Sequence, residues 1–390
     1  MGKNNLIPLR RLHGKIHDSL KAFHSKKAER KLVRSAIRKS KLQAATSPIA
    51  ELDYPVDFVV TWVDGSDPLW LAQKAQYTGE KTADINNDAS RYRDWDVFQY
   101  WFRAVEKNAP WVNKVYLVTW GHLPPWLNTD CPKLKIIKHE DIIPAEYLPT
   151  FNSHVIEWNL WRIPELSEHF VYFNDDMFIT RQLKKGSFFK NGLPKYCAVA
   201  KPIGVFDNMN AHRHARINCF GIMNSYFDIR KCIEENPEKW FNYQYGEEIE
   251  YNIRAYKDGL INGMVFSHLG VPFRKTAWES FYNHFSASID RTCRRRIRSS
   301  DDIMHQAVQM WEIFNGSFEP VSSTYYGALY YPKNENIESV KHSIISNKYR
   351  MVCINDYEGL GDCYEEIRKQ IISAFDEKYP EISAFEITKE

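Results

Sequence analysis

This 390-residue sequence has no run of apolar residues close to the roughly 20 that a helix needs to cross a bilayer. Its N-terminus also lacks the short apolar core and the small-residue cleavage site of a signal peptide. These absences argue against a membrane-spanning or secreted protein, so we expect a cytoplasmic one. With 44% hydrophobic and 14% aromatic residues, the chain can bury the core of one main globular domain.

Cysteine is present, but not in a pattern that carries chemistry. The seven cysteines form no CxxC pair, so the sequence predicts neither a zinc knuckle nor a disulfide framework. Buried free thiols are the favoured interpretation.

Positive charge is concentrated at the N-terminus. Residues 1–46 hold thirteen lysines and arginines against two acidic residues, although the whole chain carries only +3. Apolar residues recur there at helical spacing, at Leu9, Leu12, Ile16, Leu20 and Phe23. The pattern predicts a basic amphipathic arm over residues 1–48 that suits an anionic membrane surface. A solvated basic helix or a disordered tail is the alternative; nucleic-acid binding is disfavoured, because no known nucleic-acid module accompanies the charge.

The arm is followed by the pattern of an α/β domain. Residues 44–55 lose the basic charge and contain two prolines, as linkers do. Beyond them, β-branched and aromatic runs alternate with helical patterns, which predicts a Rossmann-like, nucleotide-sugar-transferase-like sheet flanked by helices. The expected strands are 57–63, 114–120, 134–138, 170–174 and 196–201. We assign residues 52–376 to this domain and 377–390 to a C-terminal tail.

Three helices are predicted within the domain. Residues 95–105 place large apolar side chains at helical spacing and stop before Pro110. A second helix is expected over 153–163, capped by Asn152 or Ser153, and a closing helix over 363–375.

The most informative stretch is FVYFNDDMF, in which an apolar strand ends at Asn174, Asp175 and Asp176. The carboxyl ends of strands form the ligand crevice of open α/β sheets, so both carboxylates are expected there. Adjacent carboxylates repel one another, and a divalent ion on a diphosphate would compensate them. The residues thus predict an Mg²⁺ or Mn²⁺ site on Asp175 and Asp176. A strand-ending turn that caps the next segment explains the same letters.

A second strand end, DFVVTWVDGSDP, delivers polar residues to the same edge. Trp62 offers a face on which a base can stack, and Gly65 allows close approach of backbone amides. Asp64 or Asp67 could bind ribose hydroxyls or metal. The segment is neither a Walker loop nor a GxGxxG fingerprint, and an ordinary Asp-Gly turn is the alternative.

The segment RTCRRRIRSSDD, residues 291–302, contains five arginines and follows His268 and His284. Guanidinium groups bind phosphate oxygens in pairs, so arginines that reach the acidic edge would neutralise a transferred phosphoryl group. For most of them, a solvated helix face is the favoured interpretation.

These segments together resemble the Stealth family, which includes bacterial capsular polysaccharide phosphotransferases. The first family block resembles DFVVTWVDGSDP, and the second runs from RYRDWDVFQYWF through FNSHVIEWNLWRIPELSEHFVYFNDDMFI. The third resembles SHLGVPFRKTAWESFYNHFSASIDRTCRRRIRSSDDI and the fourth YRMVCINDYEG. The resemblance covers most of the chain from Asp57 to Gly359.

The resemblance implies transfer of a hexose-1-phosphate from a UDP-sugar to a glycan acceptor hydroxyl, with release of UMP, in capsule or surface-polysaccharide synthesis. Its essential positions match Glu157, Asp176, His268 and Arg298. We expect Arg298 on the transferred phosphate and His268 as general base, with His284 as a possible substitute. Glu157 would hold sugar hydroxyls or compete for the base role.

The remaining expected substrate-binding residues are Asn174, Asn355 and Asp356, together with Trp62, Asp64 and Gly65. The sequence supplies no mechanism for Asn355 and Asp356. Two other functions fit the same residues: a metal-dependent glycosyltransferase that releases UDP, and a non-catalytic, membrane-associated polysaccharide-assembly protein.

Overall fold

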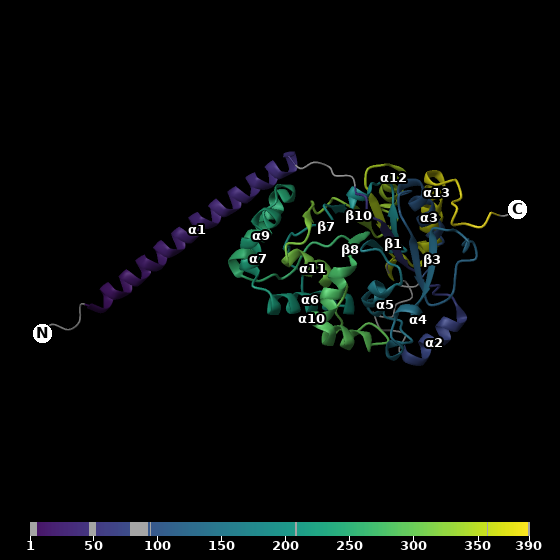
Figure 1. Ribbon diagram of the computed structural model, residues 1–390, viewed down its shortest axis with the longest axis horizontal. Coiled ribbons are helices and arrows are strands. Elements are labelled where there is room, and N and C mark those ends of the chain that lie inside the picture. The colour runs from purple at the N-terminus through teal and green to yellow at the C-terminus, as the bar shows by residue number, and fades with distance from the viewer. Residues whose placement is uncertain are drawn as a thin grey trace.

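The computed structural model describes residues 6–46, 52–78, 93, 95–206, 209–356 and 358–388; among these, the side chains of 6–25, 358 and 362 are not described. A five-stranded sheet, ordered β3-β2-β1-β4-β8, forms its centre (Figure 1). Neighbouring strands run parallel, except that β8 is antiparallel to β4. The strands are β1 (Val56–Thr61), β2 (Val115–Thr119), β3 (Leu134–Lys138), β4 (His169–Asn174) and β8 (Val271–Arg274).

Two three-stranded sheets accompany the central one, in the orders β10-β11-β5 and β6-β7-β9. Their strands are β10 (Gly327–Tyr330), β11 (Met351–Ile354), β5 (Met177–Ile179), β6 (Phe189–Lys190), β7 (Leu193–Tyr196) and β9 (Glu319–Pro320). The helices are α1 (Leu6–Thr46), α2 (Pro68–Thr78), α3 (Phe98–Asn108), α4 (His139–Ile142), α5 (Ser153–Asn159), α6 (Ala211–Tyr226), α7 (Ile229–Glu235), α8 (Pro237–Trp240), α9 (Ile249–Asp258), α10 (Lys275–Cys293), α11 (Gln306–Phe314), α12 (Ile337–Ile345) and α13 (Tyr364–Lys378).

The two faces of the central sheet are buried under different helices. Along β1, Phe58 and Val60 pack with α3, α12 and α13, whereas Val59 faces the cluster formed with α5 to α11. This alternation follows from the two-residue period of a strand. Burial on both faces explains why the parallel strands read as continuous apolar runs in the sequence. The predicted α/β fold is therefore confirmed.

Four of the five expected strands are present with small shifts at their ends, and the fifth is largely wrong. Only Tyr196 of the expected strand 196–201 lies in a strand, β7. Beyond it, the backbone N–H groups of Ala198 and Ala200 donate to side chains, Tyr245 Oη and Asn252 Oδ1, at 3.2 and 2.7 Å. Side chains thus accept the backbone hydrogen bonds that a neighbouring strand would accept if residues 196–201 formed a strand.

The three expected helices all exist, with altered limits. Residues 98–108 form α3, and the helix expected over 153–163 is α5 followed by a 3₁₀ turn at Leu160–Arg162. Asn152 caps α5, because its side chain accepts a hydrogen bond from the His154 N–H. The closing helix α13 extends to Lys378.

The expected C-terminal tail packs on the domain as far as it is described, up to residue 388. Tyr379 and Phe385 are buried, and Arg103 forms an ion pair of 2.7 Å with Glu386. Large apolar side chains therefore attach this segment to α3.

The basic arm is helical, and its C-terminal half belongs to the domain. Val33, Ala36 and Ser40 are buried, and the Ser40 hydroxyl accepts from the Tyr243 N–H at 3.1 Å. The other end of α1 extends away from the domain (Figure 1). The predicted apolar face, Leu9 to Phe23, lies outside the described side chains. Within the described part of the chain, none of the helices combines the length and apolarity needed to traverse a bilayer.

The buried His139 makes the stability of this fold depend on pH. Burial, with a contribution from His122, lowers the pKa of His139 to about 4. Below pH 6.5 the unfolded chain binds a proton that the folded chain excludes, so stability falls as the pH drops from 6.5 to 4. Each pKa unit corresponds to about 1.4 kcal/mol, so we expect this residue to remove about 3 kcal/mol over that range.

Urea unfolding of the wild type and of His139→Gln at pH 7 and pH 4.5 measures this effect. The variant should lose less free energy of unfolding on acidification than the wild type. The same substitution at the exposed His284 is the control. Equal losses in wild type and His139→Gln would contradict the prediction.

Candidate active site

A cavity of about 860 Å³ opens at the carboxyl ends of β1 and β4. These two ends lie side by side, because Thr61 of β1 pairs with Asn174 of β4. Of the residues expected from the sequence, the cavity is lined by Trp62, Glu157, Asn174, Asp175, Asp176, His268, Arg298, Asn355 and Asp356. The structure therefore gathers side chains separated by up to almost 300 positions in the sequence.

The acidic edge combines the end of β4 with the end of β11. The chain turns at Asp175 and Asp176 into β5, which pairs antiparallel with β11. The Ile354 N–H donates to the Asp176 backbone carbonyl at 2.9 Å, which places the next two residues, Asn355 and Asp356, in the cavity. The pairing of β5 with β11 explains how the fourth block reaches the cavity, for which the sequence offered no mechanism.

His268 reaches the same edge through strand β8. Since β8 runs antiparallel to β4, with Val271 opposite Tyr172, the residues that precede it extend beyond the carboxyl end of β4. His268 Nε2 lies 3.5 Å from Asp176 Oδ2. Burial alone would lower the pKa of His268, but the Asp176 carboxylate and Glu157 outweigh burial and raise it.

Cys353 completes a three-residue group with Asp176 and His268, whose ligand atoms lie within 4.8 Å of one another. Its thiol donates to Asp176 Oδ2 at 3.2 Å. Burial and the nearby carboxylates raise the pKa of this thiol well above its ordinary value. In the structure the thiol is a hydrogen-bond donor to the carboxylate, and sulfur is not a ligand that hard divalent ions such as Mg²⁺ prefer.

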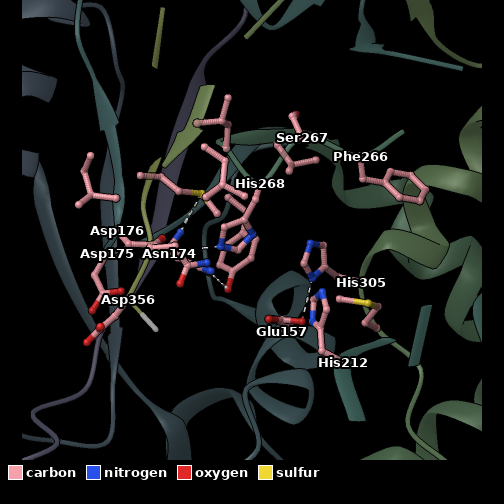
Figure 2. A pocket seen from close by; sticks show the side chains of 18 of the residues that line it. Glu157, Asn174, Asp175, Asp176, His212, Phe266, Ser267, His268, His305 and Asp356 are labelled. Carbon is pink, nitrogen blue, oxygen red and sulfur yellow. Dashed lines mark hydrogen bonds and ion pairs between the residues drawn. The ribbon is translucent and has the colours of Figure 1, made fainter. Parts of the chain in front are cut away.

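The acidic residues fit a hard divalent ion better. Asp176 Oδ1 is buried and has no hydrogen-bond partner among the described residues, and Asp175 lies beside it (Figure 2). A buried carboxylate oxygen without a donor is costly unless a cation or a substrate group faces it. Carboxylate oxygens are the ligands that such ions prefer.

Glu157 is held by a histidine that sequence reasoning missed. Helix α5 directs Glu157 into the cavity, where its Oε2 lies 2.8 Å from His305 Nδ1. Burial by itself would raise the pKa of Glu157, but His305, His154 and Arg298 lower it to about 2. Glu157 is therefore ionised near neutral pH, and so low a pKa makes it a weak base.

Arg298 is positioned by the loop that follows α10. Asp302 anchors this loop to the start of α5, because its Oδ2 accepts from Asn152 Nδ2 at 2.8 Å and from the Ser299 N–H at 3.0 Å. Arg298 then donates to the Ser153 hydroxyl at 2.7 Å and lines the cavity. The other four arginines of the segment lie outside the described lining residues.

Three expected residues are not gathered at the cavity within the described part of the chain. Asp64 makes a local turn, in which its Oδ1 accepts from the Ser66 N–H at 2.8 Å, and Gly65 follows it. His284 is exposed on α10 and bonds the Ser280 carbonyl at 2.7 Å. Trp62 does line the cavity, with one face stacked on Phe98 at 5.7 Å between ring centroids.

Sequence reasoning also missed His154 and His212, which line the cavity beside Glu157. His154 is three residues before Glu157, one helical turn away, so the α5 pattern contained a signal for it. His212 and His305 had none, because each lies far from the acidic motif in the sequence.

Comparison with known proteins identifies the family of this chain. The profiles described as Stealth protein CR1, conserved region 1, and Stealth protein CR2, conserved region 2, match residues 54–82 and 91–196. The capsular polysaccharide phosphotransferase WcwK of Streptococcus pneumoniae is 42% identical over 85% of this chain and 98% of its own length. The chain belongs to the Stealth family.

Two other relatives are also named polysaccharide phosphotransferases. The exopolysaccharide phosphotransferase cps2G of Lactiplantibacillus plantarum is 36% identical, over 85% of this chain and 96% of its own. The receptor polysaccharide phosphotransferase WefC of Streptococcus oralis is 37% identical, over 85% and 99%. Among solved structures, the galactosyltransferase LgtC aligns with 81% of this chain and 95% of its own at 10% identity; its TM-score of 0.35 supports no inference.

Proposed function

We propose that this Stealth protein transfers a sugar-1-phosphate from a UDP-sugar to a hydroxyl of a glycan acceptor, in the synthesis of a capsular or other surface polysaccharide. The supporting observation is the convergence of Asp175, Asp176, His268 and Arg298 on one cavity. The names of its relatives support the same reaction class.

In the proposed reaction, the acceptor oxygen forms a bond to the phosphorus that bears the sugar. The bond from this phosphorus to the bridging oxygen breaks, and UMP leaves with that oxygen. Such transfers depend mainly on positioning and on neutralisation of negative charge. Arg298 binds the transferred phosphate, and His268 takes the proton of the acceptor hydroxyl.

Asp175 and Asp176 would hold the metal ion, Mg²⁺ or Mn²⁺, which neutralises the diphosphate when bound. Trp62 and Asn174 would contact the nucleotide, together with Asn355 and Asp356. The Asp356 carboxylate is itself held by Arg93, at 2.9 Å. Without a metal ion, the carboxylates at this end of the cavity would repel a diphosphate, so the ion would make this end suitable for the donor.

The nucleotide product tests the proposal. Purified protein is incubated with a UDP-sugar, Mg²⁺ or Mn²⁺ and an oligosaccharide acceptor, and the nucleotides are separated by chromatography. UMP together with a phosphate-containing glycan, both abolished by EDTA, is the expected result. UDP would instead identify a glycosyltransferase, and release of neither nucleotide from a panel of UDP-sugars would support a non-catalytic role.

We further propose that the arm binds an anionic membrane surface on the cytoplasmic side. Because residues 29–40 pack on the domain, deletion of residues 1–25 is the suitable variant. Its binding to vesicles that contain anionic lipid should fall at least tenfold, since the deletion removes the apolar face together with five lysines and arginines, each worth about 1 kcal/mol near such a surface. Cosedimentation measures this, with neutral vesicles as control. Unchanged sedimentation would contradict it.

A further inference from the structure

The cavity has two chemically different ends. Figure 2 shows Asp175, Asp176 and Asp356 on one side of His268, and Glu157, His212 and His305 on the other. The first side suits a metal and a diphosphate. The second, which His154 also lines, consists largely of imidazoles, and the reaction derived above assigns no task to them.

The hydrogen bond to Glu157 fixes the tautomer of His305. An ionised carboxylate can only accept, so the proton lies on His305 Nδ1, 2.8 Å from Glu157 Oε2. We take the ring as neutral in the binding state, so that Nε2 is an acceptor. Both residues line the cavity, and both are buried, with His305 8% and Glu157 5% exposed. Since Glu157 Oε2 accepts from His305 Nδ1, we assign the contact with a ligand to His305 Nε2.

Asp302 fixes His154 in the same way. Asp302 Oδ2 already accepts from Asn152 and from the Ser299 N–H, so His154 Nδ1, at 3.0 Å, is a third donor to it. His154 is 1% exposed, and its Nε2 is buried with no hydrogen-bond partner among the described residues. An unpaired buried acceptor beside a cavity calls for a ligand group that donates.

The third imidazole, His212, adds no positive charge to this end. Burial, with help from Arg298 and other positive neighbours, lowers the pKa of His212 well below its ordinary value, so the ring is neutral. Phosphate oxygens are acceptors and would face the acceptor nitrogens of His154 and His305. Sugar hydroxyls donate, and Phe266, which lines the same side, offers an apolar surface to a pyranose ring (Figure 2).

We propose that His154 and His305 form a hydroxyl-binding subsite for a pyranose, in which the two Nε2 atoms accept hydrogen bonds from sugar hydroxyls. Glu157 and Asp302 are positioning residues that fix the two imidazoles. The proposal rests on the proposed function, because the sugar is either the one carried by the UDP-sugar or that of the acceptor. Arg298, which donates to Ser153 next to His154, places the transferred phosphate beside this subsite.

Two substitutions of His305 separate its two nitrogens. His305→Asn keeps an amide N–H near the position of Nδ1 and removes the cavity-facing acceptor. His305→Gln places an amide oxygen near the position of Nε2. We expect His305→Asn to weaken sugar binding about tenfold, the effect of one lost hydrogen bond, and His305→Gln to recover much of it. His284→Asn, on the exposed face of α10, is the matched control.

Calorimetry compares UDP with a panel of UDP-sugars, and initial rates give the KM of the oligosaccharide acceptor. UDP should bind all variants equally. If a variant loses the extra affinity that a UDP-sugar has over UDP, the subsite binds the donor sugar. If only the KM of the acceptor rises, the subsite binds the acceptor. If His305→Asn and His154→Asn change neither value, the proposal is overturned.

The tautomers give an independent readout. The ¹⁵N chemical shifts of His154 and His305 should show a proton on Nδ1 and none on Nε2 in the wild type, and Glu157→Gln should disturb this for His305 alone. Protonated Nε2 atoms in both residues would overturn the subsite even if UMP release is established. Failure of the wild type to bind any UDP-sugar would instead refute the proposed function.

Discussion

Asp176→Asn is expected to lower the rate of UMP release about 10³-fold while leaving the protein folded. Asp176 Oδ1 is buried without a partner among the described residues, so this oxygen is available to a metal ion. A metal contributes several kcal/mol of charge stabilisation to a phosphoryl transfer, and about 4 kcal/mol corresponds to this factor. The amide oxygen of the variant can still accept from the Cys353 thiol, which preserves the local packing.

The measurement is single-turnover release of UMP at saturating Mg²⁺ or Mn²⁺, with circular dichroism to verify the fold. Asp258→Asn, an exposed carboxylate on α9, should retain wild-type activity. Cys353→Ala should keep its response to Mg²⁺, because the protonated thiol is not expected to bind the ion. Near-wild-type rates for Asp176→Asn would remove the carboxylate from the reaction.

Arg298→Lys is expected to lower kcat by about 10²-fold, with a smaller change in KM. A guanidinium can keep its bond to the Ser153 hydroxyl and still present further N–H donors to a phosphate, whereas an ammonium has no such fork. Loss of one preorganised donor to developing charge typically costs a factor of 10² to 10³. Because the contact strengthens as charge is transferred, kcat rather than KM should fall.

Arg295→Lys is the matched control, since Arg295 lies in the same loop but forms an exposed ion pair of 3.1 Å with Asp301. Such pairs contribute little, so this variant should behave as the wild type. Ser153→Ala should show an intermediate loss, because it only frees the Arg298 side chain. Equal losses in Arg295→Lys and Arg298→Lys would indicate a general effect on the loop instead of a phosphate contact.

Much of the fold could be predicted from local pattern. Strand 134–138 was predicted to the residue, and the helix over 98–108 was placed within three residues at each end. Both follow from periodicity, which depends only on neighbours in the chain. Strand 196–201 failed because the Tyr245 hydroxyl and the Asn252 side chain, about fifty residues away, bind its backbone.

The same distinction between local pattern and long-range contact applies to the residues of the site. Asp175 and Asp176 were predictable, because a buried strand that ends in carboxylates can be recognised from consecutive residues alone. The partnership of Glu157 with His305 spans 148 residues and was not. From the sequence, Glu157 was a candidate base or a ligand of sugar hydroxyls; in the structure its carboxylate bonds the His305 imidazole.

By itself, the sequence determined the α/β class, the acidic edge after β4 and the Stealth family, because apolar periodicity and motif order are properties of the chain alone. Only the tertiary structure decided which histidines and arginines reach that edge. The antiparallel β8 delivers His268, β11 delivers Asn355 and Asp356, and Asp302 ties the Arg298 loop to α5. Strand pairing and side-chain hydrogen bonds join residues across sequence distances that no local pattern encodes.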